Sequence, residues 1–231
     1  MLSVEGLSAW YGEAQALRDV DLAIEGGQVV TLVGRNGAGK STTLRCVMGL
    51  HEGPRRGRIT LDGRELGHLP AHRRARLGLG YVPDDRGIYA TLTVEENLLL
   101  PPAVGPEPWS LDRIYTMFPR LKDRRRSAGS KLSGGEQQML SIARVLRMGA
   151  RLLLLDEPTE GLAPVLVQQV RDLLLEVKQH GVTILLIEQN LRFATSVAER
   201  HYLLVEGQVV ESLTNEEVRA REGELLRYLG V

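Results

Sequence analysis

One eight-residue segment constrains the fold more than any other part of this 231-residue chain. It reads Gly34-Arg35-Asn36-Gly37-Ala38-Gly39-Lys40-Ser41 and matches the whole G-x-x-x-x-G-K-[ST] pattern of a phosphate-binding loop. An apolar run at 29–33 precedes it and a helical pattern at 42–48 follows it, as expected for the strand and the helix that such a loop joins. Glycines let consecutive backbone N–H groups face phosphate oxygens, while the lysine supplies a positive charge and the serine a hydroxyl for Mg²⁺. The segment therefore predicts binding of a nucleoside triphosphate.

Two further segments carry chemistry that fits this loop. The first reads Leu132-Ser133-Gly134-Gly135-Glu136-Gln137-Gln138 and begins a helical pattern at 134–147, where the free N–H groups of a helix start predict a second anion site. The second is an apolar run at 152–155 that ends in the adjacent carboxylates Asp156 and Glu157. In phosphoryl transfer, carboxylates hold the metal ion and orient the attacking nucleophile. The loop by itself fixes the ligand and not the activity, since it could belong to a kinase, a GTPase, a helicase or a motor.

Together these segments resemble the ATP-binding cassette (ABC) ATPases, in the family's order and over nearly the whole chain. Residues 132–138 resemble the family's signature motif, and residues 151–157 resemble its Walker B strand. The subfamily is indicated by four shorter motifs, which are most similar to ATPase subunits of branched-chain amino acid importers. These motifs are Tyr81-Val82-Pro83, Leu92-Thr93-Val94-Glu95-Glu96-Asn97, Gly161-Leu162-Ala163-Pro164 and Glu188-Gln189-Asn190.

The pattern of elements predicts an α/β fold. Strand-like runs at 29–33, 79–82, 152–156, 183–187 and 202–205 alternate with helical patterns, which is typical of a mostly parallel, covered sheet. The resemblance implies a P-loop NTPase core of this kind, with an N-terminal antiparallel β subdomain and a helical subdomain. We therefore expect a single ABC ATP-binding domain over 1–231, divided as follows: 1–28 and about 57–63 antiparallel β, about 29–83 and 151–212 core, about 84–150 helical subdomain, and 213–231 C-terminal helices.

The resemblance also assigns ligands and site residues. It implies ATP and Mg²⁺, with Lys40, Glu157 and Gln189 as catalytic residues and Ser41, Asp84 and Asp156 at the metal ion. The expected nucleotide contacts are Tyr11, Gly34, Arg35, Asn36, Gly37, Ala38, Gly39, Lys40, Ser41 and Thr42 from one cassette and Ser133, Gly134, Gly135 and Glu136 from a second. The aromatic Tyr11 has two readings, as a platform for adenine or as an ordinary residue of a β-hairpin.

Three positions depart from the general ABC pattern. Most members have a glutamine where this chain has Asp84, a histidine where it has Gln189, and an aspartate where it has Ala163. An ionised aspartate accepts hydrogen bonds but cannot donate them, and a glutamine donates without carrying charge. We therefore expect slower or retuned turnover at an intact site.

Composition excludes several other classes. A formal net charge of zero argues against a general grip on nucleic acid, and the longest apolar runs, of about four residues, are far too short to span a membrane. The N-terminus lacks the features of a signal peptide, which makes the cytoplasm the default location. The resemblance implies a peripheral subunit at the cytoplasmic face of the inner (cell) membrane. A lone Cys46 predicts no internal disulfide. The basic residues at 120–126 form either a solvated stretch or a contact with a partner or lipid headgroups.

The sequence thus predicts an ATP-hydrolysing subunit of an ABC importer for branched-chain or related amino acids. The expected partners are a second ATPase subunit, identical or related, transmembrane permease subunits and, indirectly, a periplasmic or extracellular solute-binding protein. We expect the segment 83–100 to dock on the permease. The alternative is the same cassette serving urea, short amides or another small solute. A non-transport ABC ATPase of DNA repair or translation is disfavoured, because the chain has neither a long coiled coil nor a second cassette, and a P-loop kinase or GTPase is disfavoured by residues 132–138.

Overall fold

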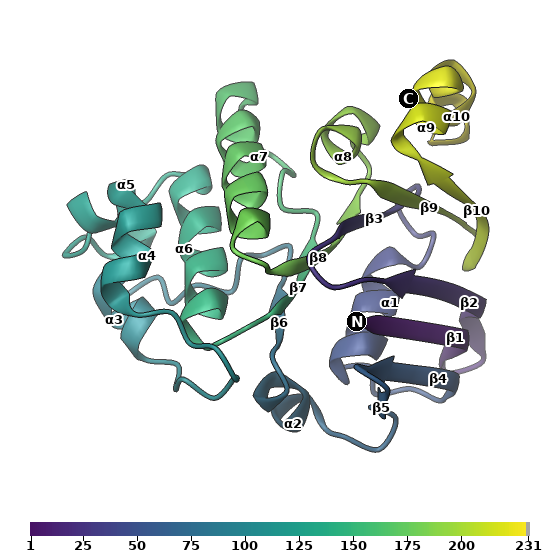
Figure 1. The fold of residues 1–231 in the computed structure, drawn as a ribbon, viewed down its shortest axis with the longest axis horizontal. Coiled ribbons are helices and arrows are strands. Elements are labelled where there is room, and N and C mark those ends of the chain that lie inside the picture. Colours follow the sequence, from purple (N-terminus) through teal and green to yellow (C-terminus); the bar gives the residue numbers. More distant parts are fainter. Residues whose placement is uncertain (230–231) are drawn as a thin grey trace.

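The computed structural model describes residues 1–229 and contains two sheets with helices packed around them (Figure 1). The smaller sheet has the strand order β2-β1-β4-β5 and is antiparallel throughout. Its strands are β1 (Leu2–Tyr11), β2 (Ala14–Ile24), β4 (Arg55–Leu61) and β5 (Arg64–Glu65). This sheet is the predicted N-terminal antiparallel region, with longer strands than the glycine spacing of residues 1–28 suggested.

The larger sheet has the order β10-β9-β3-β8-β7-β6 and is parallel except at β10. Its strands are β3 (Val29–Val33), β6 (Leu79–Val82), β7 (Leu152–Asp156), β8 (Thr183–Glu188), β9 (Arg200–Val205) and β10 (Gln208–Thr214). The four leucines of β7 alternate between two hydrophobic clusters, Leu153 and Leu155 on one face and Leu152 and Leu154 on the other. Because helices cover both faces, every residue of β7 is buried and the strand is apolar in both alternations.

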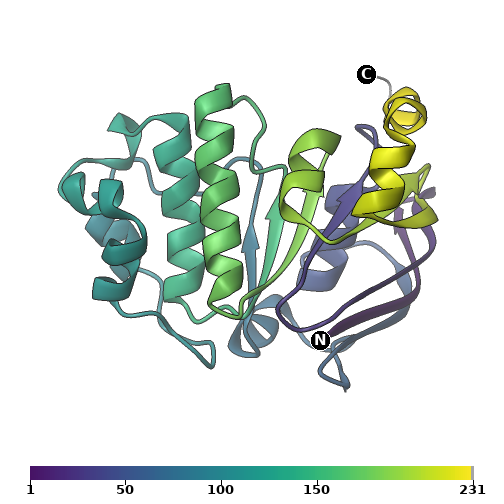
Figure 2. The ribbon, with the colours of Figure 1, turned by 45° about the horizontal axis from the view of Figure 1, so that its top comes forward.

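One helix, α1 (Lys40–Met48), lies between the two sheets, where Leu44 and Val47 join the apolar residues of both. The opposite face of the large sheet is covered by α6 (Gly134–Arg147), α7 (Pro164–Gln179) and α8 (Leu191–Val197). Beyond α6, at the left of Figure 1, lie α3 (Val94–Leu99), α4 (Leu111–Met117), α5 (Pro119–Asp123) and the short 3₁₀ turn at Gly129–Lys131. The remaining helices are α2 (Ala71–Arg76), at the bottom of Figure 1, and α9 (Asn215–Ala220) and α10 (Glu222–Leu229), which pack on α8 and β9. Figure 2 shows α6 and α7 side by side in front of the large sheet.

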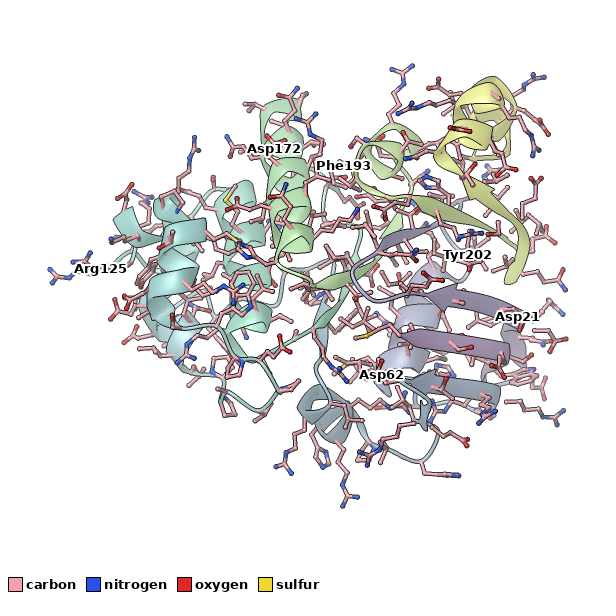
Figure 3. All side chains as sticks on the ribbon, in the orientation of Figure 1. Asp21, Asp62, Arg125, Asp172, Phe193 and Tyr202 are labelled. Carbon is pink, nitrogen blue, oxygen red and sulfur yellow. The ribbon has the colours of Figure 1, made fainter. Side chains whose placement is uncertain are left out.

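Two polar contacts join parts that are distant in sequence. The hydroxyl of Tyr202 on β9 accepts a hydrogen bond from Ala23 N (3.0 Å) and donates one to Ala23 O (3.1 Å), which links the large sheet to β2. Asp62, in the turn between β4 and β5, forms an ion pair of 2.6 Å with Arg151 at the start of β7. Both Tyr202 and Asp62 are labelled in Figure 3, which places them at the junction of the two sheets.

The predicted α/β class with a mostly parallel sheet is confirmed, whereas several element boundaries differ. The helix after the phosphate-binding loop begins at Lys40, two residues earlier than expected. The predicted C-terminal helical segment divides at Arg221, which has a φ of −117° and whose side chain pairs with both Glu211 and Glu224. The strand β10 continues to Thr214, beyond the expected end of the core at 212. Residues 230 and 231 of the predicted C-terminal segment lie outside the described part of the chain.

Within residues 1–229, no helix is long and apolar enough to cross a membrane.

Candidate functional site

The phosphate-binding loop connects β3 to α1, as the sequence predicts. Gly37 and Gly39 have φ values of 81° and 104°, in the left-handed region that side chains disfavour. A Cβ atom on Gly34 would lie 2.5 Å from the carbonyl oxygen of Leu204, and one on Gly39 would lie 2.7 Å from Cδ2 of Leu17. Since no side chain caps the start of α1 at Gly39, its first N–H groups stay free for an anion. Glycine is therefore required here by conformation and by space.

Lys40 is 4% exposed and its ammonium group lies against three acceptors. It donates to the carbonyl oxygens of Gly34 (2.8 Å) and Arg35 (3.2 Å), and it forms an ion pair of 2.9 Å with Glu157 Oε1. The loop and the end of β7 are thus joined by a charge-assisted contact. Two of the three predicted catalytic residues are therefore in direct contact.

Asp156 is 1% exposed at the end of β7 and accepts two hydrogen bonds. Ser41 Oγ donates to Oδ1 (3.0 Å) and Tyr81 OH donates to Oδ2 (2.9 Å). Burial raises the pKa of the carboxyl, the two hydrogen bonds oppose that rise, and the nearby charges of Asp84 and Glu157 add to it. Ser41 and Asp156 were predicted to share the metal ion, whereas Tyr81, which lies 75 residues before Asp156 in sequence, had no predicted role.

The donor set at Ser41 and Asp156 fits Mg²⁺. A hydroxyl and a carboxylate are hard oxygen ligands, and Mg²⁺ takes one or two of them together with waters and substrate phosphates. Asp84, the third predicted metal residue, is exposed, and its carboxylate accepts from the N–H of Asp85 (2.9 Å). It hydrogen-bonds neither Ser41 nor Asp156, although its charge reaches Asp156. In residues 1–229, no group of three or more His, Cys, Asp or Glu side chains is placed to hold a metal ion.

Glu157 follows the strand in a strained conformation. Its φ is 43°, which is uncommon for a residue other than glycine and typical of functional sites. Its N–H donates to the carbonyl oxygen of Ile187 on β8 (3.0 Å), so β8 holds the turn in which Glu157 lies. Glu157 and Gln189 line the same cavity of about 500 Å³. The third predicted catalytic residue therefore shares a cavity with the second.

Tyr11 lies at the end of β1 close to the phosphate-binding loop. Its ring is 48% exposed and meets the ring of His51 edge-on, with centroids 4.9 Å apart. Its hydroxyl is 3.4 Å from Thr42 Oγ1 on α1. An adenine ring can stack on an exposed aromatic face next to the loop. Stacking of adenine on Tyr11 therefore stays a prediction.

The signature segment begins α6 and lies on a different part of the molecule. Ser133 caps the helix, since its hydroxyl accepts from Glu136 N (3.3 Å) and its N–H donates to Glu136 Oε2 (2.8 Å). Gly135 packs closely on α7, where a Cβ atom would lie 2.8 Å from Leu166. Among the described residues, no hydrogen bond or ion pair joins 132–138 to the phosphate-binding loop. Within one described chain, neither Gly134 nor Gly135 is hydrogen-bonded to Lys40.

The departure at Ala163 has a local consequence. Ala163 is the N-cap of α7 and offers no side-chain acceptor to the first turn, while Pro164 occupies the first helical position. An aspartate there would accept a hydrogen bond from the helix start. The loop between β7 and α7 therefore depends on other contacts, among them the bond from Thr159 to Glu188 (2.7 Å).

Comparisons with known proteins agree on the type of domain. The family described as ABC transporter matches residues 17–160. The high-affinity branched-chain amino acid transport ATP-binding protein BraG of Pseudomonas aeruginosa is 41% identical, over 95% of this chain and 97% of that protein. The lipopolysaccharide export system ATP-binding protein LptB of Haemophilus influenzae is 34% identical, over 100% of this chain and 97% of that protein. A solved dimeric ATP-binding cassette, in a post-hydrolysis state with ADP and Pi, is similar with a TM-score of 0.80 at 25% identity, over 93% of this chain and 99% of that one.

Proposed function

The chain belongs to the ABC transporter family, and from that membership we propose that it is the subunit that powers an importer of branched-chain or related amino acids. ATP binding and hydrolysis are the activity of this cassette. The proposal concerns the solute, the partners and the role of each residue. The single observation that carries the choice of solute is the 41% identity to BraG across almost the full length of both chains.

In the proposed site, each residue has an electrostatic or geometric task. The loop N–H groups and Lys40 hold the phosphates of ATP, and Tyr11 stacks on the adenine. Ser41 and Asp156 would hold Mg²⁺, with the exposed Asp84 as a further acceptor, and the ion would supply positive charge to neutralise the phosphates. Glu157 accepts hydrogen bonds from the attacking water, and Gln189 donates one to the γ-phosphate. The ion pair between Lys40 and Glu157 supports this arrangement, because it brings the group proposed to bind phosphate within 2.9 Å of the carboxylate proposed to act on water.

We further propose that two cassettes complete each site. Residues 133–136 would contact the nucleotide bound to the loop of a second subunit, either a copy of this chain or a related one. The separation of the signature segment from the phosphate-binding loop within one chain supports this arrangement, as does the similarity to a dimeric cassette. Permease subunits would provide the path through the membrane, a solute-binding protein would deliver the amino acid, and the cassette would lie at the cytoplasmic face as a peripheral subunit.

The solute is tested by transport. The chain would be reconstituted in vesicles with a permease and a solute-binding protein encoded beside it, and uptake of radiolabelled leucine, isoleucine and valine would be measured. We expect ATP-dependent accumulation that is lost in Lys40→Ala. ATP-dependent uptake of urea or an amide without leucine would assign the alternative solute. Movement of lipopolysaccharide instead would place the chain with relatives such as LptB.

The role of Glu157 is tested by Glu157→Gln. The amide removes the carboxylate that polarises water and keeps the size of the side chain, so ATP binding should persist while hydrolysis falls by a factor of about 100 or more. The variant should also accumulate as an ATP-bound dimer on size exclusion. Wild-type turnover in this variant would reject the assigned role.

A further inference from the structure

Glu188 is a buried carboxylate that none of the roles above uses. It is the last residue of β8 and is 3% exposed. Its Oε1 atom accepts two hydrogen bonds from Thr159, one from the hydroxyl (2.7 Å) and one from the N–H (3.3 Å). Its Oε2 atom accepts from the N–H of Asn190 (3.4 Å). The two oxygens of one side chain therefore bind two different loops.

These two loops carry the two side chains proposed to act on the γ-phosphate. Thr159 lies two residues after Glu157, and Asn190 lies one residue after Gln189. Asn190 also begins α8, because its side chain accepts from Phe193 N (3.1 Å). All of Glu157, Thr159, Glu188, Gln189 and Asn190 line the same cavity. A shift of the Glu188 carboxylate would consequently move both loops.

Burial of this carboxylate costs free energy, because its charged form loses contact with water. Burial raises the pKa of Glu188 to about 7, the hydrogen bonds from Thr159 and Asn190 counteract part of the rise, and the charge of Glu157 adds to it. Arg192 on α8 and Glu160 in the loop after β7 line the cavity, and neither makes an ion pair with Glu188 in the described residues. An apolar residue or an amide would avoid the desolvation cost. The acid is therefore best explained by a need for two acceptor oxygens at this point.

We propose that Glu188 is a positioning residue that fixes Glu157 and Gln189 relative to each other by binding Thr159 and Asn190 with opposite oxygens of one carboxylate. This inference rests on the proposed roles of Glu157 and Gln189 in ATP hydrolysis, and it is independent of the transported solute. Glu188 holds the turn after β7 through its hydrogen bonds with Thr159. A serine at position 159 would keep this link, because serine retains the hydroxyl donor.

The test is steady-state ATPase kinetics on Thr159→Val, Thr159→Ser, Glu188→Gln and the double variant Thr159→Val/Glu188→Gln. Valine keeps the shape of threonine without the donor, and the amide has one acceptor oxygen instead of two. We expect each of Thr159→Val and Glu188→Gln to lower kcat by about tenfold with KM for ATP changed less than about twofold. Thr159→Ser should restore wild-type kcat. The double variant should be no slower than the slower single variant, because both changes break one linkage.

The chain offers a matched control at a remote Thr–Glu pair. The Thr214 hydroxyl donates to Glu217 Oε2 (3.0 Å) on the surface at the start of α9. Thr214→Val and Glu217→Gln make the same chemical changes away from the site and should leave kcat and KM unchanged. Unchanged kcat in Thr159→Val, a Thr159→Ser variant as slow as Thr159→Val, or multiplicative losses in the double variant would overturn the proposal. If Glu188→Gln does not fold, the kcat values of Thr159→Val and Thr159→Ser decide whether the positioning role holds.

A pH profile separates positioning from general loss of structure. Protonation of Glu188 near pH 7 converts one acceptor oxygen into a donor, so wild-type kcat should fall as the pH drops below about 7. In Glu188→Gln, kcat should lack this fall below about pH 7 and should already be lower than wild-type kcat above pH 7. An identical profile in both would overturn the proposal. If these kinetic effects are observed but leucine is not taken up, only the proposed transport function is contradicted.

Discussion

Gln189 stands where the family resemblance leads us to expect a histidine. A histidine can offer a charge-assisted hydrogen bond, about twice as strong as the neutral one that an amide donates. Gln189→Ala should therefore lower kcat moderately, by about tenfold for about 1.4 kcal/mol of lost transition-state stabilisation, with ATP affinity nearly intact. Steady-state kinetics and a nucleotide-binding titration measure the two effects.

The matched variant at this position is Gln189→His. It should be at least as active as wild type, because it restores a donor of the same reach that can also carry charge. Unchanged kcat in both Gln189→Ala and Gln189→His would mean that this side chain is only a polar residue at the end of a strand.

At this scale, the sequence predicted residues that belong to recognised motifs and missed partners outside them. Lys40, Ser41, Asp156 and Glu157 were assigned through the motifs that resemble the family's, whose spacing fixes which position faces the phosphates. The bond between Tyr81 and Asp156 spans 75 residues, and the bond between Thr159 and Glu188 spans 29. Such pairs depend on which strands are neighbours. A polar residue at the end of an apolar strand, as Glu188 is, was the one signal available.

At the scale of elements, α1 is held at its C-terminal end by a buried cation. Arg74 on α2 is fully buried, and its Nη1 atom donates to the carbonyl oxygens of Cys46 (2.9 Å) and Val47 (2.7 Å). Burial lowers the pKa of this guanidinium to about 10, which leaves it charged near neutral pH. It therefore satisfies carbonyls that the helix end leaves open and complements the helix dipole.

Arg74→Met should lower the free energy of unfolding by about 2 to 3 kcal/mol, since the carbonyl oxygen of Val47 would lose its donor and that of Cys46 would keep only its bonds from Gly49 N and Arg55 Nη1 (both 3.2 Å). For a chain of this size the melting temperature should fall by about 5 to 10 °C. Arg73→Met is the matched control, because Arg73 is the exposed neighbour on the same helix and should change the melting temperature by less than about 2 °C. Equal melting temperatures for the two variants would contradict the capping role.

The segment after β6 is the element expected to meet the permease. Tyr89, Leu99 and Leu100 are 46%, 51% and 55% exposed, which is unusual for large apolar side chains. The same segment is bonded to α6, because Arg86 donates to Gln137 Oε1 (3.0 Å) and Arg144 donates to the carbonyl oxygen of Gly87 (2.5 Å). A displacement of Asp84 could thus move this surface and the signature helix as one body.

Single cysteines at Ile88 or Tyr89 should crosslink to a coexpressed permease. Cys46 is buried, so the introduced thiol is the only exposed one in the described residues. A cysteine at Arg227 on α10 serves as the comparison and should crosslink weakly. Crosslinks confined to 222–229 would show that the docking surface is misassigned.

The elements themselves were predicted unequally. The buried strands at 29–33 and 79–82 have the bounds predicted for them. A short apolar run that leads into a glycine-rich loop or a Tyr-Val-Pro motif is typical of a buried strand. The short helix α2 and the strand β5 carry few apolar residues, and α2 is held by the side chain of Arg74. Such elements depend on tertiary contacts that local pattern does not contain.

At the scale of the whole molecule, stability depends on a polar chain through the core of the large sheet. His201 on β9 is completely buried, with Nδ1 2.6 Å from Thr31 Oγ1 and Nε2 2.7 Å from Asn215 Oδ1. Asn215 Nδ2 donates to the carbonyl oxygen of Ala198 (2.6 Å), so its Oδ1 atom must accept. We infer that Nε2 carries the proton and that Nδ1 accepts from Thr31. This chain joins the strand before the phosphate-binding loop to the start of the C-terminal helices.

Acid should therefore weaken the whole fold through His201. Burial lowers the pKa of its imidazole below the ordinary value of 6.5, so the unfolded chain takes up a proton at a higher pH than the native one. The contribution to stability is complete above about pH 6.5 and is lost as the pH falls further, by about 1.4 kcal/mol for each unit of pKa difference.

Glu188 acts in the opposite direction, because its raised pKa of about 7 makes stability fall as the pH rises from about 4.5 to about 7. The two effects overlap in a simple pH titration of the wild type. The difference between wild type and His201→Gln isolates the imidazole, since Glu188 is common to both proteins. Urea unfolding at pH 7.5 and 5.0 should show that wild type loses more stability on acidification than His201→Gln does. Equal losses in the two proteins would mean that His201 is protonated in the native core at no cost, which would contradict its lowered pKa.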